Sequence, residues 1–395
     1  MTRYLIVTVA KYTACIVEPT VRLIHNIRRR ISHLPAIHWG RVPALVAGPA
    51  VILFPCSANR LCCGLAGIIA VKGKTGRNIP IDLTALVALV DSVEAGLQGT
   101  PSLQTDAVTG EYPTGQATLD SLLAEIRTLK QEGPFLTLFK DPTAQKTVAD
   151  LSVRLSTLLQ REQARLAKLV GSLETHVVDI LSTRIETLKD MRWCLDVELA
   201  GNIGRIRSLM PGSADPGPDS RITVFRQINA VLNSIDRLEV RGRDSAGISI
   251  LFIIPAEAYE AISAALDRKG LTSDFERRMD RDVLKNTSIS LNRSASDDGQ
   301  SIVALTAVYK VAAEIGSLGD NIRYLRQQIQ QDEILQLIAA APHRFHTVSS
   351  HTRWASVGAI TEPNCHPVDN TVTGATLKDR PIIHACLNGD IDNYL

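Results

Sequence analysis

Two adjacent cysteines are the first residues in the chain whose type and setting could support covalent chemistry. Cys62 and Cys63 stand directly before "GLAGIIA" (64–70), a short apolar run interrupted by glycines. A thiol at the start of such a run could act as a nucleophile, or it could be an inert thiol in a buried strand. Neither the residue types nor their spacing decides between these roles, and about sixty residues precede the pair.

Two other patterns resemble a zinc site and a phosphate-binding loop, but neither is a good match. His343, His346 and His351 have a loosely metal-like spacing, but surface or strand histidines explain them better than a zinc site does. "GKTG" (73–76) resembles the end of a phosphate loop, yet Ile68 stands where the first glycine is required. We therefore expect no metal and no cofactor.

Patterns of apolar residues predict the elements that would position these groups. Residues 80–215 are predicted to be helical, and between Leu151 and Ile180 apolar residues at three- and four-residue steps are typical of a helical hairpin or short coiled coil. "MPGSADPGPDS" (210–220) predicts a loop or linker. Beyond it we expect two helices, over 221–239 and 321–341. We also expect four strands, over 240–254, 301–311, 343–355 and 380–390. This mixture indicates an α+β layered fold with antiparallel hairpins.

Composition limits the class of protein. Of the 395 residues 45% are hydrophobic and 21% charged, which is typical of a globular protein. A net charge of +2 does not point to nucleic acid as a partner. Seven cysteines at irregular spacing do not form a disulfide framework, so we expect a reducing, cytoplasmic compartment.

Residues 1–62 differ from the rest and form a leader. They hold eight Lys or Arg against one acid, Glu18, and include an uncharged run at 42–54. That run of thirteen residues is too short to span a bilayer unaided. Four interpretations remain open: a propeptide, a targeting segment, a membrane-surface anchor, or a start codon assigned too far upstream. We favour the last and the propeptide over membrane contact.

Five short blocks occur in an order that resembles a known family. They are "CCGLAGIIA", "LEVRGRDSAG", "HTRWAS", "NCHP" and "LNGD". Together they resemble the class II glutamine amidotransferase domain, and the Arg-Gly-x-Asp-Ser-Ala-Gly block favours the branch of isomerising glucosamine–fructose-6-phosphate aminotransferases. The resemblance implies the four-layer αββα sandwich of N-terminal-nucleophile hydrolases. That domain would comprise residues 63–79 and 221–395, with 80–215 as a large all-α insertion.

The resemblance also implies roles in hydrolysing a glutamine side-chain amide. Cys63 matches the nucleophile, because Gly64 and Gly67 match the family glycines. In this family the base is the nucleophile's own α-amine, whose ordinary pKa of about 8 suits proton transfer at neutral pH. The chain would therefore be inactive until Cys63 becomes the first residue.

The remaining matches concern the substrate and the support of the site. Asn388 and Gly389 match the donors to the tetrahedral oxyanion, although Asn-Gly alone is a common hairpin turn. Arg353 matches the arginine that grips the glutamine α-carboxylate, Trp354 matches the flap tryptophan, and Ser356 joins them as substrate-binding. Residues expected to support the nucleophile loop are Arg241, Gly242, Asp244, Ser245 and His366.

The sequence also departs from the family pattern. Val240 and Arg243 replace usual tyrosines, and Val357 replaces a usual histidine after the flap. The family aspartate that holds the substrate amino group, and the two sugar-isomerase domains, have no match before Leu395, so the chain resembles the front of a longer protein.

The resulting expectation is the ammonia-donating domain of a glucosamine-6-phosphate synthase in the amino-sugar route to UDP-N-acetylglucosamine. L-Glutamine and fructose 6-phosphate would give glucosamine 6-phosphate and glutamate, with the sugar bound by the unmatched domains of a homo-oligomer. One alternative is a class II amidotransferase with another acceptor, like amidophosphoribosyltransferase or glutamate synthase. The other is a truncated, inactive homologue whose helices mediate association.

Overall fold

A computed structural model describes the chain in ten segments: 7–10, 50–52, 64–71, 81–98, 115–212, 215–296, 299–312, 317–355, 358–370 and 382–388. The chain divides into two compact units. Unit 1 combines residues 1–74 with 209–395, and unit 2 comprises 75–208. The chain thus leaves unit 1 after its first long strand and returns to it near the predicted 210–220 loop.

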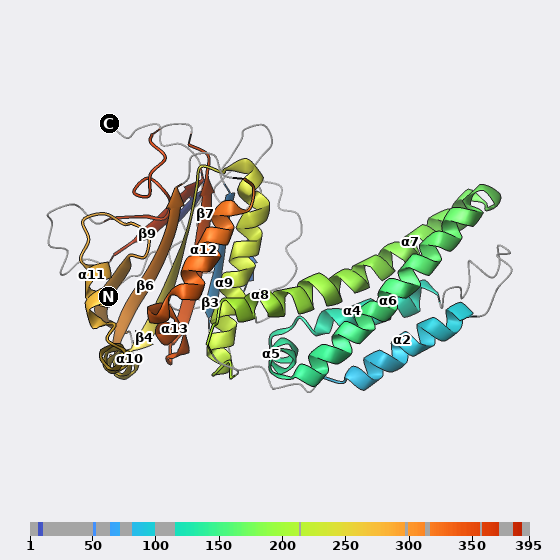
Figure 1. The fold of residues 1–395 in the computed structure, drawn as a ribbon, viewed down its shortest axis with the longest axis horizontal. Helices are drawn as coiled ribbons and strands as arrows, with labels where there is room; N and C mark the ends of the chain where they lie inside the picture. Colours follow the sequence, from blue (N-terminus) through green and yellow to red (C-terminus); the bar gives the residue numbers. More distant parts are fainter. Residues whose placement is uncertain are drawn as a thin grey trace, which may run out of the picture. The chain divides into compact units, whose positions relative to one another are not determined.

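Unit 1 is built on an antiparallel sheet in the order β2-β3-β7-β4-β6-β5 (Figure 1). The two strands at its centre, β7 and β4, therefore come from segments about one hundred residues apart. Its strands are β2 Ala50–Ile52, β3 Gly64–Val71, β4 Ser245–Pro255, β5 Ile289–Ala295, β6 Ser301–Ala312 and β7 Phe345–Arg353.

A second, smaller sheet has the order β1-β9-β8. Its strands are β1 Val7–Ala10, β8 Val368–Asp369 and β9 His384–Asn388. The pairing of β1 with β9 is parallel, and that of β8 with β9 is antiparallel. Strands β1 and β2 both come from the first 62 residues, so parts of the basic leader belong to both sheets.

Helices cover one face of the large sheet, and β9 approaches the other face. Helix α9 (Asp219–Leu238) packs on β3 and β7, while α12 (Asp320–Gln331) packs on β4 and β6; the two helices run side by side in Figure 1. Because both faces of β4 are covered, nearly all of its residues are buried and its sequence is almost uniformly apolar. The helix-facing side contains Ile248, Ile250 and Phe252, which are fully buried.

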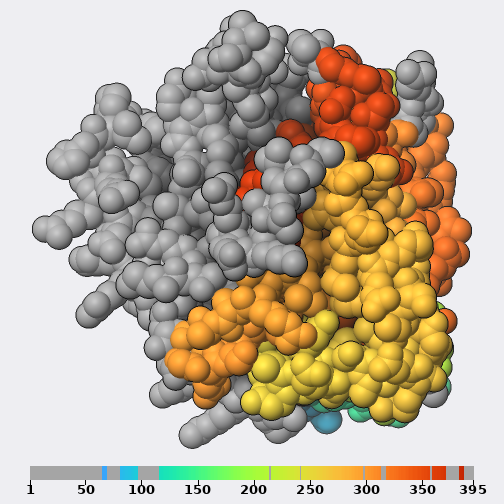
Figure 2. Space-filling view, turned by 90° about the vertical axis from the view of Figure 1, so that its left-hand side faces the viewer, coloured from blue at the N-terminus to red at the C-terminus, as the bar shows by residue number. Residues whose placement is uncertain are grey.

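Three further helices complete unit 1, one of them against the edge strand β5 and another against α9. They are α10 (Ala256–Lys269), α11 (Thr272–Met279) and α13 (Glu333–Ala340). Helix α11 contacts β5, and α10 contacts α11 and α13. Figure 2 views unit 1 from this side, where the yellow-to-orange surface comes from the chain between α10 and β6.

Unit 2 is all helical and has its own core. The residues buried between its helices include Leu155 on α6 and Leu188 on α7. A π-helical stretch, Cys194–Gly201, continues α7 into α8. The helices are α2 Leu83–Gln98, α4 Gln116–Thr128, α5 Glu132–Lys140, α6 Pro142–Leu169, α7 Thr175–Trp193 and α8 Asn202–Ser208.

The expectation of an α+β protein is confirmed, with one correction to the predicted helices. The single helix predicted over 321–341 is two helices, because Asp332 ends α12 and caps α13 by accepting hydrogen bonds from Ile334 N and Leu335 N at 3.0 and 3.2 Å. Among the residues that the structure describes, no helix has both the length and the apolar composition of a membrane span.

Candidate functional site

Three of the five sequence blocks meet at one end of the large sheet. Gly64, the first residue of β3, pairs with Thr352 near the end of β7, and Ser245 at the start of β4 pairs with Arg353. The "CGLAG", "RDSAG" and "HTRWA" blocks are therefore neighbours in space. Cys63 directly precedes Gly64 in the sequence, but the proposed nucleophile itself lies outside the described residues.

Asp244 ties the start of β4 to the chain that leaves β7. Its backbone N–H donates to Arg353 O at 3.2 Å, and its carboxylate Oδ2 accepts a hydrogen bond from Ala355 N at 2.6 Å. A hydrogen bond from a backbone N–H to an ionised carboxylate is stronger than one between neutral groups. The contact therefore fixes the segment that carries Arg353 and Trp354.

Two glycines allow backbone segments to approach the start of β4. A Cβ at Gly242 would lie 2.7 Å from Arg353 C and 2.9 Å from Trp354 N. A Cβ at Gly247 would lie only 2.1 Å from His366 O. No side chain fits at either position without moving backbone, which explains glycine in this block through packing.

Arg353 and Trp354 remain partly accessible at this end of the sheet. The guanidinium of Arg353 donates from Nη1 to Ala359 O at 3.2 Å, and Asn364 Nδ2 donates to the same carbonyl at 3.0 Å. Arg353 and Asn364 are thereby tied to the same loop carbonyl. Trp354 is 41% exposed, a position suited to contact with a small molecule.

His366 lies on the inner face of the sheet, beside β7. Its ring is 4.6 Å from the ring of His351, at an interplanar angle of 65°. Burial, with the nearby charges of Arg353 and Lys310, lowers the pKa of His366 to about 4. The imidazole is therefore neutral near pH 7, which suits a supporting role.

Strand β9 leads toward the same end of the sheet. His384, its first residue, shares a cavity with Thr347 of β7, and Cys386 lies beside Ser349, two residues further along β7. β9 therefore advances in the direction of Arg353 and ends at Asn388. Gly389 and Ser356 lie outside the described residues, and Arg241 ends the short helical turn Glu239–Arg241 that precedes Gly242.

Two buried charged residues near this end were not predicted as site residues. Glu239 accepts a hydrogen bond from Gly319 N, and burial raises its carboxyl pKa. Lys310 of β6 is fully buried, and its Nζ donates to Leu284 O at 2.9 Å and Glu362 O at 3.0 Å. Burial lowers the Lys310 pKa to about 8. A lysine inside an otherwise apolar strand was the available sequence signal.

The three histidines with metal-like spacing do not converge. His343 and His346 lie on the helix-covered side, where His343 Nε2 and His346 Nδ1 are 3.1 Å apart. His351 lies on the opposite face of β7, because side chains alternate along a strand. Among the described residues, no three His, Cys, Asp or Glu side chains are grouped as metal ligands.

Comparisons of this chain with protein-family models, with curated proteins and with solved structures found no match.

Proposed function

We propose that the chain is the glutamine-hydrolysing, ammonia-donating domain of an aminotransferase similar to glucosamine-6-phosphate synthase. The observation that carries this proposal is the meeting of the separate sequence blocks at one sheet end: Gly64 beside Thr352, Asp244 bonded to Ala355, and His366 over Gly247. This convergence supports the proposal, because residues that serve one site must lie together.

In the proposed reaction, the Cys63 sulfur attacks the side-chain amide carbon of glutamine, and the α-amine of Cys63 takes the thiol proton. The proton is then passed to the departing nitrogen, so that ammonia and a thioester form. Water hydrolyses the thioester to glutamate and restores the thiol. Asn388 and Gly389 would stabilise the oxyanion, and Arg353 would grip the α-carboxylate, with Trp354 and Ser356 beside the substrate.

The layer arrangement of unit 1 supports the N-terminal-nucleophile sandwich as part of this proposal. Helices α9 and α12 cover one face of the large sheet and β9 approaches the other, which corresponds to an α-β-β order. In the proposed fold, unit 2 is an insertion after the first strand of the catalytic domain. Fructose 6-phosphate as acceptor follows from the "RGRDSAG" resemblance.

The first test is the intact mass and N-terminal sequence of the protein purified from its own host. A mature chain that begins at Cys63 would have the α-amine that the mechanism requires. That protein should be alkylated by 6-diazo-5-oxo-L-norleucine, a glutamine-analogue electrophile, with the adduct mapped to Cys63 by mass spectrometry.

Matched variants locate the chemistry. Cys63→Ala should abolish labelling and glutaminase activity, whereas Cys194→Ala, which removes a buried thiol of unit 2, should retain both. Arg353→Lys keeps the charge but loses the bidentate geometry, so the KM for glutamine should rise by about tenfold, equivalent to 1.4 kcal/mol. A processed, folded chain that is neither labelled nor active would refute the proposal. If the inactive protein also remained oligomeric after deletion of residues 221–395, the result would favour the alternative in which its helices mediate association.

A further inference from the structure

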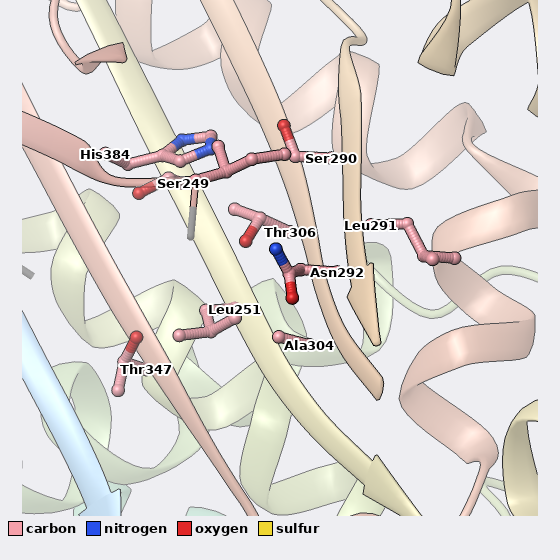
Figure 3. A pocket seen from close by; sticks show the side chains of 10 residues that line it. Ser249, Leu251, Ser290, Leu291, Asn292, Ala304, Thr306, Thr347 and His384 are labelled. Atoms are coloured by element: carbon pink, nitrogen blue, oxygen red, sulfur yellow. The ribbon is translucent and has the colours of Figure 1, made fainter. Parts of the chain in front are cut away.

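Buried polar groups of unit 1 are arranged in two different ways. In a cavity of about 30 Å³ between the two sheets, the polar side chains come from four strands of the large sheet and from β9, and they do not converge on one point (Figure 3). Around the start of α12, in contrast, hydrogen bonds follow one another from buried side chains to the backbone of Arg353. This second arrangement bears on the proposed glutamine site.

The first turn of α12 is attached to the turn that follows α9. Asn321, the second residue of α12, is 3% exposed, and its Nδ2 donates to Arg243 O at 2.8 Å. The fully buried carboxylate of Glu239 accepts a hydrogen bond from Gly319 N, directly before α12. Gly242 N donates to Glu239 O at 3.1 Å, which closes the turn between these two contacts. The turn is therefore fixed to α12 at both ends.

One peptide group connects this attachment to Arg353. The carbonyl of the peptide group between Arg243 and Asp244 accepts the hydrogen bond from Asn321, and the N–H of the same group donates to Arg353 O at 3.2 Å. A peptide group is planar and trans, so its C=O and N–H point in opposite directions and turn together. A rotation that breaks one of these hydrogen bonds therefore breaks the other. Asn321 thus fixes the direction of the donor to Arg353 O.

The contacts beyond this peptide group hold the backbone that carries the flap tryptophan. Asp244 Oδ2 accepts from Ala355 N at 2.6 Å. A Cβ at Gly242 would lie 2.7 Å from Arg353 C and 2.9 Å from Trp354 N, so the two backbone segments are in close contact. Support from α12 therefore reaches the backbone of residues 353–355.

We propose that Asn321 is a positioning residue of the proposed glutamine site. It fixes the Arg243–Asp244 peptide group, which fixes the backbone of Arg353, and so it aligns the guanidinium of Arg353 with the α-carboxylate of glutamine. Asn321 is too deeply buried to contact the substrate itself. The inference rests on the proposed function, but Asn321 lies outside all five sequence blocks, so the resemblance assigns it no role.

The first test compares glutamine hydrolysis by the chain that begins at Cys63 and by its Asn321→Ala variant. Loss of one hydrogen bond that orients Arg353 weakens binding of the substrate and of the transition state alike. The KM for glutamine should therefore rise by about threefold to tenfold while kcat stays nearly unchanged. A merely structural role would instead lower the amount of folded enzyme, and so the apparent kcat, at an unchanged KM.

Asn233→Ala is the matched control. Asn233 of α9 accepts a hydrogen bond from Arg326 Nη2 of α12 at 2.8 Å, so this variant also removes a contact between an asparagine and α12. That contact is not part of the path to Arg353. Asn233→Ala should therefore retain the KM of the parent chain.

Deuterium exchange tests the same contact without an assay of catalysis. The amides of Asp244 and Ala355 should exchange several-fold faster in Asn321→Ala than in the parent, because their hydrogen bonds depend on the fixed peptide group. In Asn233→Ala they should exchange at the parent rate. If Asn321→Ala fails to fold, as judged by circular dichroism, Asn321→Leu nearly keeps the size of the side chain, lacks the donor and should give the same two results.

Two kinds of result would overturn the proposal. One is a KM that is unchanged in folded Asn321→Ala or Asn321→Leu, or that rises equally in Asn233→Ala. The other is unchanged exchange at Asp244 and Ala355. A parent chain without glutaminase activity would refute the proposed function, whereas exchange would still decide whether Asn321 fixes the backbone of Arg353.

Discussion

Gly247→Ala tests directly whether the "RDSAG" and "NCHP" blocks are packed as the structure shows. The added methyl would lie 2.1 Å from His366 O and 3.3 Å from Cys365 Sγ. To reach an ordinary contact of 3.4 Å, the carbonyl would have to move by about 1.3 Å, and it belongs to backbone. Overpacking of this kind costs roughly 1–3 kcal/mol. We therefore expect unit 1 to lose about 2 kcal/mol of unfolding free energy, or roughly 4–8 °C in Tm.

The assay is urea unfolding followed by tryptophan fluorescence in a Trp193→Phe background, because Trp193 is the tryptophan of unit 2. Gly67→Ala is the matched control. It lies on the same face of the sheet, and its added Cβ would be 3.6 Å from the nearest atom, an ordinary contact. If Gly247→Ala and Gly67→Ala unfold at the same urea concentration, the packing of His366 on Gly247 is wrong.

Two further predictions concern stability. Burial lowers the pKa of His346 to about 3 and those of His366 and His384 to about 4. In the unfolded chain a histidine has a pKa near 6.5. Between these folded and unfolded pKa values, the unfolded chain therefore binds more protons than the folded chain. The free energy of unfolding should fall on acidification from pH 6.5 to 4, by up to about 4 kcal/mol per pH unit for three histidines. In His346→Gln the change of this free energy per pH unit, measured by urea unfolding at several pH values, should be about a third smaller. Leu155→Ala should destabilise unit 2 by roughly 2–5 kcal/mol, because Leu155 is fully buried. Val153 is 67% exposed on the same helix, so Val153→Ala should change the free energy of unfolding by no more than about 0.5 kcal/mol. Circular dichroism during urea unfolding measures both, and equal values would contradict the assigned helix face.

Strands and helices with a clear apolar period could be predicted from the sequence, because their burial pattern is local. Helix α9 and strand β6 lie within a residue or two of their predicted ranges. Elements whose stability depends on distant partners were not predicted. Helix α11 is mostly polar, and it is held by Arg278, which pairs with Asp332 at 2.6 Å, 54 residues later in the chain.

The candidate site shows the same division between local and distant information. Gly242, Asp244 and Arg353 could be predicted as site residues, because each belongs to a short contiguous block of the sequence. The sequence did not indicate that Lys310 reaches the carbonyl of Glu362, because that contact depends on the register of β6 against β4 and on the path of a loop 52 residues away. Spacing within a motif does not contain that information.

The leader's place in the second sheet leads to a last prediction, about β9. Val368 and Asp369 of β8 pair with Ala385 and His384 of β9. In the part of the sheet that the structure describes, residues 386–388 of β9 pair with β1. A chain that begins at Cys63 has no β1, and each lost backbone hydrogen bond is worth about 1 kcal/mol. Deuterium exchange should therefore accelerate several-fold at residues 386–388 in the shortened chain, and less at 384–385. Protection that is equal in both chains would mean that β1 does not hold β9. Asn388 could then keep its position after the leader is removed, as the proposed mechanism requires.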